Sequence, residues 1–318
     1  MKALVCVGAP DLVNLQDVPP CFHEHGEVLV RVEAFSINRG ELNRLRTPTN
    51  LGWRPGWDFA GVVARTPAGT VPAGSRVCGI ALEGSWAEAV SVPLGQLAPI
   101  PEQVSSQLAS ALPVAGLTAF RVLGLCGDLS GKSVLVFGAA GGVGRIAVQL
   151  AHRAGARVTA VVSGPQRAAG LAELGADTVV WDLASLRHRY DVILESVGGS
   201  TLAAAIGLIA PRGTIVCFGN SSRQATTFDV SELYPRQVTL RGFHLLYDIV
   251  RNPPADDLAH LLDLCAGGQL VLDMAAVAPW SEAGAVLEDL EARRLAGKAV
   301  LLTDSSAAAE VDYWSGKA

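Results

Sequence analysis

The chain has 318 residues, half of which are hydrophobic, and its formal net charge is −5 at pH 7. This length is sufficient for two domains with substantial cores, while the acidic balance and the lack of a basic cluster argue against nucleic-acid binding. No run of about 18 apolar residues is free of charged and turn residues, so we expect neither a transmembrane helix nor a membrane partner.

The N-terminal segment Met1–Pro10 predicts a first β-strand. It lacks the long apolar core and the small-residue cleavage site of a signal peptide. The six cysteines lie mostly within apolar stretches and form no Cys-x-x-Cys pair, which is typical of buried, reduced thiols. A cytoplasmic location is therefore expected.

Residues 1 to about 115 carry short runs with strand character, such as Glu27–Phe35 and Gly61–Ala64, which are broken by proline and glycine. The pattern predicts a β-rich domain with few helices. His23-Glu24-His25 is the only His-x-His pair of the chain, and as a polar stretch before a strand it is interpreted as a surface turn.

From about residue 116 to residue 245 the pattern changes to strands that alternate with helices. Alternation of this kind predicts a parallel sheet covered by helices. The predicted strands are Ser133–Phe137, Arg157–Val162, Thr178–Trp181, Asp191–Leu194, Gly213–Phe218 and Val238–Arg241.

The strongest motif follows the first of these strands. An apolar strand leads into a cluster of glycines, and an amphipathic helix begins near Gly142. A diphosphate approaches the backbone closely only where side chains are absent, and the helix N-terminus presents free N–H groups to it. The order strand, glycines, helix therefore predicts a dinucleotide site. Its expected contacts are Gly141, Gly142, Val143 and Gly144.

The second strand indicates which dinucleotide is bound. It should lie beside the first strand, so its carboxyl end meets the adenosine ribose about 20 residues past the glycines. Chains that bind NAD usually place Asp or Glu there, whereas this sequence offers Ser163 and Arg167. An arginine suits the 2′-phosphate of NADPH because it is always charged and donates in a fork. NADPH is the predicted cofactor, and the alternative is that Arg167 is a solvated residue of the next helix.

The last part of the chain, after Asn252, predicts one helix and two strands. The helix is expected at 257–265, and the strands at 270–277 and 299–302. Residues 305–318 are small and polar apart from Tyr313 and Trp314, which indicates a loose tail.

In this order the features resemble the medium-chain dehydrogenases/reductases over nearly the whole chain, and within them the zinc-free quinone oxidoreductase and enoyl reductase branch. Several motifs in the right order are far more specific than any one. They are Gly26–Val32, Ser36–Asn38, Pro55–Val63, Gly74–Val77, Gly116–Ala119, Gly138–Gly144, Cys217–Ser222 and Gly297–Leu301.

The resemblance implies an α/β fold class with two kinds of domain. Residues 1–115 would form a GroES-like, β-rich catalytic domain. Residues 116–245 would form a Rossmann domain that binds NADPH on a doubly wound parallel sheet, and residues 246–318 would return to the catalytic domain. Membership also implies a homodimer that acts on a small-molecule substrate.

Zinc-dependent members of the family carry Cys, then Gly-His-Glu, then a later Cys as ligands. At those positions this chain has Ser36, then Gly56-Trp57-Asp58, and then the Ala115-Gly116 region, and it lacks the closely spaced cysteines of a structural-zinc loop. Catalytic zinc takes Cys, His or carboxylate ligands. We therefore expect chemistry without metal, and a zinc alcohol dehydrogenase is the disfavoured alternative.

The resemblance also implies further cofactor contacts. Asn38 would lie by the nicotinamide, and Thr118 would hold the cofactor near the substrate cleft. Lys298 is a weaker phosphate candidate, and Trp181 is expected to flank the adenine. Loops beyond the carboxyl ends of the late strands would reach the nicotinamide. Their candidate residues are Val197, Phe218, Gly219, Asn220 and Ser221.

Reduction of a conjugated carbonyl compound needs a donor that stabilises the developing oxyanion and a source for a proton. By resemblance, the Arg39–Asn43 stretch lines the substrate cleft, and Asn43 stands where many relatives have a tyrosine. An amide donates a hydrogen bond but is not an acid. The proton source stays open among water, Glu41, Tyr247 and His244. A solvated helix-face carboxylate is the alternative for Glu41, and packing is the alternative for Tyr247 and His244.

Trp53, Trp57 and Trp86 suggest an apolar substrate pocket, although core packing explains each of them equally well. The sequence thus predicts an NADPH-dependent, metal-independent oxidoreductase that delivers hydride to a quinone, an enone or an enoyl thioester. The abundance of Ala, Arg and Gly suggests a GC-rich bacterial gene and, with it, secondary metabolism. The alternative is a family member that binds NADPH but has a regulatory or structural role with little turnover.

Overall fold

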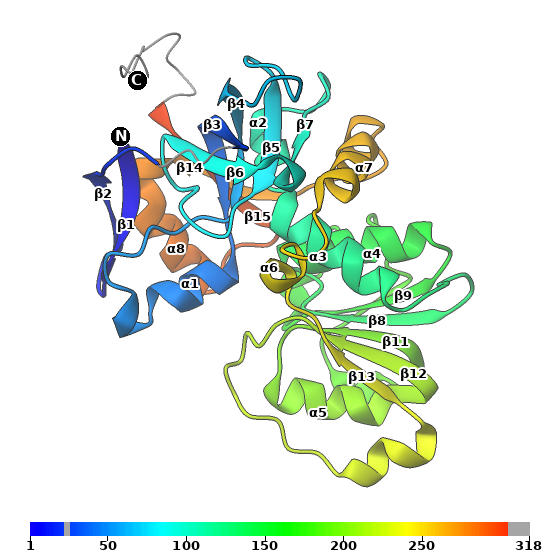
Figure 1. Ribbon diagram of the computed structural model, residues 1–318. Helices are drawn as coiled ribbons and strands as arrows, with labels where there is room; N and C mark the ends of the chain where they lie inside the picture. The colour runs from blue at the N-terminus through cyan, green and yellow to red at the C-terminus, as the bar shows by residue number, and fades with distance from the viewer. Residues whose placement is uncertain (22–25, 305–318) are drawn as a thin grey trace. The chain divides into compact units, whose positions relative to one another are not determined.

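The computed structural model describes residues 1–21 and 26–304 (Figure 1). These residues divide into two compact units. Of the described residues, the β-rich unit comprises 1–21, 26–113, 276–294 and 299–304, and the parallel-sheet unit comprises 114–275 and 295–298. The segment His23-Glu24-His25 and the predicted tail 305–318 lie outside the described residues.

The β-rich unit is organised around one long antiparallel strand, β3, which pairs with β4, β6 and β15. A seven-stranded sheet contains these strands together with β5, β7 and β14, and β1 and β2 form a separate two-stranded sheet. The strands are β1 (Lys2–Gly8), β2 (Leu12–Asp17), β3 (Glu27–Ile37), β4 (Asp58–Arg65), β5 (Arg76–Ile80), β6 (Ala89–Pro93), β7 (Leu97–Pro99), β14 (Met274–Pro279) and β15 (Lys298–Leu302).

Few helices were expected in this unit, and the described residues contain short ones. The α-helices are α1 (Arg39–Leu45), α2 (Ser106–Ser110) and α8 (Ala283–Glu291), and the 3₁₀ turns are η1 (Pro48–Asn50), η2 (Leu94–Gln96) and η7 (Trp280–Glu282). The core includes Phe35 and Trp86, whose rings stack at a centroid distance of 5.6 Å. Burial of such large side chains stabilises the unit.

The parallel-sheet unit contains six strands in the order β10-β9-β8-β11-β12-β13, and every recorded pair is parallel. The predicted parallel sheet is thereby confirmed. Its strands are β8 (Ser133–Phe137), β9 (Arg157–Val161), β10 (Thr178–Val180), β11 (Tyr190–Glu195), β12 (Ile209–Cys217) and β13 (Thr239–Gly242).

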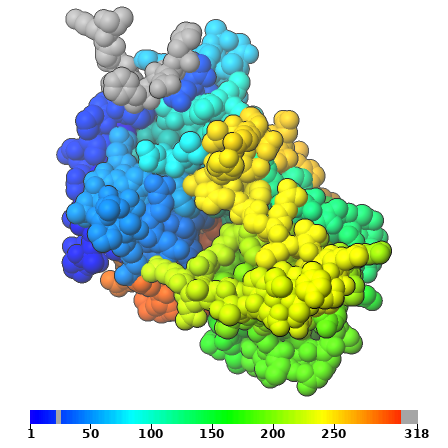
Figure 2. Space-filling view, turned by 60° about the horizontal axis from the view of Figure 1, so that its bottom comes forward, coloured from blue at the N-terminus to red at the C-terminus, as the bar shows by residue number. Residues whose placement is uncertain are grey.

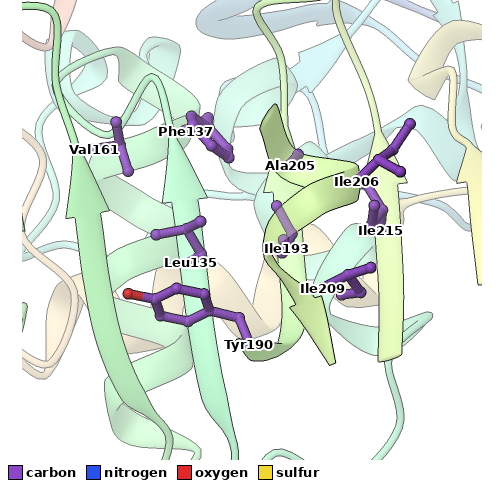
Figure 3. Packing of buried hydrophobic residues seen from close by; sticks show 9 residues of the cluster. All are labelled: Leu135, Phe137, Val161, Tyr190, Ile193, Ala205, Ile206, Ile209 and Ile215. Carbon is purple, nitrogen blue, oxygen red and sulfur yellow. The ribbon is translucent and has the colours of Figure 1, made fainter. Parts of the chain in front are cut away.

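Helices cover both faces of this sheet, with α4 on one side and α5 on the other (Figure 1). The α-helices are α3 (Pro113–Gly124), α4 (Gly142–Arg153), α5 (Gly199–Leu208), α6 (Leu245–Asp248) and α7 (Ala255–Ala266). On the face under α5, Ile206 of that helix belongs to a cluster with Leu135, Ile193 and Ile215 from three neighbouring strands (Figure 3). Strands β8 and β11 are buried almost throughout, as expected of a parallel sheet that helices cover on both faces.

The crossovers around β10 differ from the regular alternation that the sequence predicted. Within the described chain, β9 connects to β10 through the 3₁₀ turn η3 (Pro165–Arg167), and β10 connects to β11 through η4 (Leu183–Ser185), with no α-helix in either connection. Gly170 and Gly175 have positive φ angles of 76° and 102°, which interrupt a helix in the first connection. The second connection is too short to contain a helix with two loops.

The third predicted stretch, 246–318, is shared between the two units. Residues up to 275 cluster with the parallel sheet, because α7 buries one face there through Leu258, Leu261 and Leu262. Strand β14 begins at Met274 rather than at the predicted residue 270. Among the described helices, none combines the length and apolar character needed to cross a bilayer.

Candidate active site

The glycine-rich loop after β8 leaves the backbone bare at the N-terminus of α4. Gly138 has a φ angle of 66°, and Gly141 is the N-cap of the helix. A Cβ atom added to Gly144 would lie 2.4 Å from the carbonyl oxygen of Gly138, which no real side chain tolerates. The close approach of these backbone segments forms the kind of cradle that a dinucleotide diphosphate requires.

The start of β15 lies against this cradle. The backbone N–H of Gly297 donates to the carbonyl oxygen of Ala140 at 3.1 Å. The aliphatic part of Lys298 passes over the helix N-terminus, since a Cβ on Gly142 would lie 2.6 Å from Lys298 Cδ. The structure thus brings the predicted phosphate candidate Lys298 beside the glycines.

The carboxyl end of β9 carries the two residues predicted to discriminate between NADPH and NADH. Ser163 is exposed and Arg167 is half-buried at the end of η3. The guanidinium Nη2 of Arg167 donates to the carbonyl oxygen of Leu295 at 2.9 Å. An arginine carries five N–H donors in a fork that suits a phosphate.

Sequence reasoning missed Arg145, which is buried in the first turns of α4. Its Nε forms an ion pair with Asp273 at 2.5 Å, and its Nη1 donates to the carbonyl oxygen of Ala169 at 3.1 Å. These contacts fix two loops beside the glycine cradle. An arginine directly after the last glycine of the motif was the available signal.

Loops after β8, β11 and β12 meet through Ser196, a second residue that the sequence analysis did not single out. Ser221 donates its backbone N–H to the Ser196 carbonyl oxygen at 3.1 Å. A Cβ on Gly138 would lie 2.9 Å from Ser196 Oγ, and a Cβ on Gly219 would lie 3.0 Å from the Ser196 carbonyl oxygen. The predicted contacts Val197 and Phe218–Ser221 therefore lie at the same sheet edge as the glycine loop.

Glu195, at the end of β11, stabilises the turn at Val197 and Gly198. It is fully buried, and one of its carboxylate oxygens accepts the backbone N–H groups of Val197 at 2.8 Å and Gly198 at 3.0 Å. Burial raises the pKa of Glu195 above its ordinary value, and the two hydrogen bonds oppose that effect. Glu195 is therefore a structural support of the Val197 turn.

The segment after β13 contains the proton-donor candidates His244 and Tyr247. His244 is the N-cap of α6, where its Nδ1 accepts the backbone N–H of Tyr247 at 3.3 Å. The Tyr247 side chain is 65 % exposed, and the Arg251 guanidinium lies 4.2 Å from its ring centroid. A neutral His244 that accepts at Nδ1 carries its proton on Nε2.

In the β-rich unit, Asn38 and Glu41 form one hydrogen-bonded group at the start of α1. Glu41 is fully buried, with Oε2 accepting the backbone N–H of Asn38 at 2.7 Å and Oε1 accepting that of Trp57 at 2.8 Å. The alternative of a solvated helix-face carboxylate is therefore wrong. Its backbone partners hold Glu41 as a hydrogen-bond acceptor.

The amide of Asn38 is oriented by two carboxylates. Its Nδ2 donates to Asp58 Oδ2 at 2.9 Å and to Glu41 Oε2 at 3.3 Å. Asp58 is fully buried and also accepts the hydroxyl of Ser36. Asn43, the remaining candidate on α1, is half-buried. Its backbone carbonyl oxygen accepts the Thr47 hydroxyl at 3.3 Å.

The same residues test whether a zinc ion fits the unit. A serine hydroxyl and a tryptophan indole stand where zinc-dependent chains carry Cys and His, and the Asp58 carboxylate is bound by Ser36 and Asn38. Within residues 1–21 and 26–304 there is no cluster of three His, Cys, Asp or Glu side chains suited to a metal. The donor set present does not fit catalytic zinc.

The three tryptophans of the predicted apolar pocket have different surroundings. Trp86 is fully buried in the core, and Trp53 donates to Glu83 at 3.0 Å while Arg44 lies over its ring. Trp57 is buried against the backbone of Gly40, where a Cβ would lie 2.6 Å from the indole ring. Its Nε1 has no hydrogen-bond partner among the described residues.

A cavity of about 660 Å³ in the described structure lies away from the glycine cradle. It belongs to the parallel-sheet unit and is bordered by the second half of α3, the end of α4 and α7. Its lining includes Phe120, Arg121, Leu150 and His260 but none of the glycine-loop residues. Size alone does not make it the reaction site, because the candidate residues lie elsewhere.

Comparison with known proteins places these observations in a wider context. Residues 142–266 match the family model described as zinc-binding dehydrogenase, and residues 24–102 match the alcohol dehydrogenase GroES-like domain. The chain is 31 % identical to prostaglandin reductase-3 of Bos taurus over 290 residues, which cover 81 % of this chain and 74 % of that protein.

Two further similarities span almost all of the molecule. Quinone oxidoreductase 1 of Escherichia coli is 26 % identical over 324 residues, covering 93 % of this chain and 97 % of that one. A mycobacterial structure described as complexed with NADPH superposes with a TM-score of 0.85 at 28 % identity, covering 95 % of this chain and 99 % of that chain.

Proposed function

We propose, from the premise that this chain belongs to the quinone oxidoreductase branch of the medium-chain dehydrogenases/reductases, that it transfers hydride from NADPH to a conjugated carbonyl compound. Membership of that family makes it an oxidoreductase. The observation that carries the proposal is the bare glycine cradle at the N-terminus of α4, with Arg167 and Lys298 at the same sheet edge.

The parallel-sheet unit has the features that NADPH requires. The backbone from Gly141 to Gly144 would bind the diphosphate, and Ser163 with Arg167 would bind the 2′-phosphate. The loops at Val197 and Phe218–Ser221 would lie against the nicotinamide end, beyond the carboxyl ends of the strands. Thr118 is buried on α3, and we propose that it contacts the cofactor.

Bound NADPH supplies a hydride equivalent, and the protein must then place the reactants and handle one proton. Both N–H groups of the Asn38 amide are engaged by carboxylates, so we assign Asn38 to orienting the cofactor rather than to stabilising an oxyanion. Asn43 is assigned the hydrogen bond to the substrate oxygen.

Glu41 is assigned a positioning role, because both of its carboxylate oxygens bind backbone N–H groups. The proton donors that remain in the protein are Tyr247 and His244, with water as the alternative. Exposed positions on a one-turn helix give both side chains access to a ligand at the carboxyl end of β13. No step requires a metal ligand.

The substrate is an electrophilic alkene or quinone. Hydride transfer to the β-carbon of such a compound needs a hydride donor, a hydrogen-bond donor to the developing oxyanion and a proton donor. It does not need a Lewis acid. Quinones, enones and enoyl thioesters share this chemistry. An acceptor from bacterial secondary metabolism, met in the cytoplasm, agrees with the sequence composition.

We also propose that two copies of the chain associate through β13. All four residues of this edge strand are exposed, and an edge strand presents unpaired backbone groups that favour pairing with another strand. Phe228, Val230, Tyr234 and Leu240 expose apolar side chains on β13 and on the segment before it, shown in yellow in Figure 2. Light scattering tests this, since a monomer at micromolar concentration contradicts it.

The proposed activity is tested by following NADPH oxidation with a quinone, a simple enone and an enoyl thioester in parallel. Turnover of one acceptor, with NADPH preferred over NADH, supports the proposal and selects the substrate class. Tight NADPH binding without turnover of any acceptor would instead favour a regulatory or structural role for the chain.

A further inference from the structure

Arg121, a half-buried arginine of helix α3, binds the segment that follows β13. Its guanidinium forms ion pairs with Asp248 at 2.5 Å and with Asp257 at 2.9 Å, and Nη1 also donates to the carbonyl oxygen of Asn252 at 3.0 Å. The Arg121 side chain is only 11 % exposed. Charge-assisted hydrogen bonds are stronger than neutral ones, and one guanidinium that binds three acceptors adds geometric specificity.

The three partners of Arg121 belong to consecutive parts of the chain. Asp248 ends α6, the one-turn helix that begins at its N-cap His244 and carries Tyr247. Asn252 follows α6 and donates its side-chain amide to Asp248 Oδ1 at 2.9 Å. Asp257 lies in the first turn of α7. Arg121 therefore fixes the segment 244–252 at two points and joins it to α7.

Few other contacts hold this segment. Leu245 and Ile249 are its buried side chains, while Tyr247, Val250 and Arg251 are exposed. A four-residue helix has too few internal hydrogen bonds to be stable alone. Its orientation therefore depends on tertiary contacts, which are the packing of Leu245 and Ile249 and the bonds that Arg121 makes with Asp248 and Asn252.

We infer that Arg121 is a positioning residue that orients the His244–Asn252 segment toward the substrate. The inference rests on the proposed function, in which His244 and Tyr247 act on the substrate. Arg121 touches neither NADPH-binding glycines nor Tyr247 in the contacts of the described chain, so its effect would pass through Asp248. Loss of Arg121 should raise the KM for the acceptor while leaving the affinity for NADPH in place.

The chain offers a graded set of variants. Arg121→Gln removes both ion pairs, and Arg121→Lys keeps the charge but has no fork with which to bind two carboxylates at once. Asp248→Asn removes the ion pair to the segment but leaves the bond to Asn252, whereas Asp257→Asn removes only the ion pair to α7. Arg189→Gln is the matched control. Arg189 directly precedes β11, at the amino ends of the parallel strands, and donates to the backbone carbonyl oxygens of Gly207 and Ile209.

We expect Arg121→Gln and Asp248→Asn each to raise the acceptor KM about tenfold. The double variant should be no worse than either single one, since both changes break the same bond. Lysine should rescue part of the loss. Asp257→Asn and Arg189→Gln should change this KM less than about twofold, and the Kd of NADPH should stay constant throughout. An unchanged KM in Arg121→Gln, or an equal rise in Arg189→Gln, overturns the inference.

Hydrogen exchange separates this inference from the proposed function. In Arg121→Gln the amides of 244–252 should exchange faster, while those of β8 and α4 stay protected. Protection of 244–252 that is unaltered in this variant would contradict a positioning role, whether or not an acceptor has been found. Absence of turnover in the wild-type protein would count against the proposed function alone.

Discussion

The backbone N–H of Trp57 donates to Oε1 of Glu41 at 2.8 Å, so the turn before β4 is tied to the first helix of the β-rich unit. The other oxygen of the same carboxylate accepts the N–H of Asn38. One buried side chain thereby fixes the backbone at both Asn38 and Trp57. Glu41 therefore serves as a structural acceptor for two backbone N–H groups.

Glu41→Gln should destabilise the β-rich unit. A glutamine offers one acceptor and one N–H₂ donor, so one of the two backbone N–H groups loses its partner, which costs about 1–3 kcal/mol of unfolding free energy. Urea unfolding measures this loss. Glu83→Gln, on the exposed partner of Trp53, is the control and should stay within about 0.5 kcal/mol. Unchanged stability with abolished turnover would indicate that Glu41 is an acid after all.

Arg167→Glu should weaken NADPH binding far more than NADH binding. The change places a carboxylate where a 2′-phosphate is expected, and the loss of a charged hydrogen bond costs about 1.5–3 kcal/mol, or roughly 10- to 100-fold in Kd. Fluorescence titration with both dinucleotides measures it. Arg157→Glu, at the other end of β9, should leave the ratio of the two Kd values unchanged. Equal weakening of both dinucleotides by Arg167→Glu would refute the assignment.

Gly144→Ala should disrupt the glycine cradle. The new methyl group would lie 2.4 Å from the Gly138 carbonyl oxygen and 2.6 Å from the Ala139 Cα, so the loop has to move. We expect both weaker NADPH binding and a lower melting temperature. Gly207→Ala on α5 meets no atom within 4 Å and should be neutral or stabilising, because alanine favours a helix more than glycine does. Unaltered NADPH affinity in Gly144→Ala would place the diphosphate elsewhere.

Asp191 should make a pH-dependent contribution to stability. The backbone N–H of Ser133 donates to Asp191 and lowers its pKa below the ordinary value of 3.8, and the Ser133 hydroxyl adds to this effect. A lowered folded-state pKa stabilises the fold above pH 3.8, and this contribution disappears as the pH falls through the folded-state value. Asp191→Asn should therefore be less stable than wild type at pH 7, and the gap should narrow toward pH 3.

Glu195→Gln provides the opposite sign for comparison. Burial raises the pKa of Glu195, so folding disfavours its charged form, and stability is lost as the pH rises through the folded-state pKa. The unfolding free energy of Glu195→Gln minus that of wild type should therefore be larger at pH 7 than at pH 4. Unfolding free energies that differ from wild type by the same amount at both pH values, in either variant, would contradict the cited pKa shifts.

Local pattern was sufficient to predict the strands of the parallel sheet. Strand β8 has the predicted bounds because an apolar run is followed directly by Gly138, whose positive φ angle ends it. The crossovers around β10 were harder to predict, since their apolar residues pack on the sheet without forming a helix. The burial of Glu41 was not predictable either, because its partner Trp57 is distant in sequence and only the folded backbone brings them together.

The candidate site followed a similar division. The cradle glycines lie where the motif placed them, because strand, turn and helix are consecutive in the chain. Arg145, Ser196 and Arg121 were missed because each acts through partners from other elements: Asp273, the Gly219 loop and Asp248. A sequence pattern signals residues that share one element more readily than residues that meet through tertiary packing.

Hydride transfer from NADPH to a conjugated carbonyl compound is tested by labelling C4 of NADPH with deuterium. Mass spectrometry then shows whether the product of an activated alkene or quinone contains the label. With an alkene, we expect one deuterium from the cofactor on the β-carbon of the product, and the second hydrogen should come from solvent. Consumption of NADPH with an alkene whose product carries no deuterium, or no consumption with any acceptor despite tight binding, would contradict hydride transfer from NADPH.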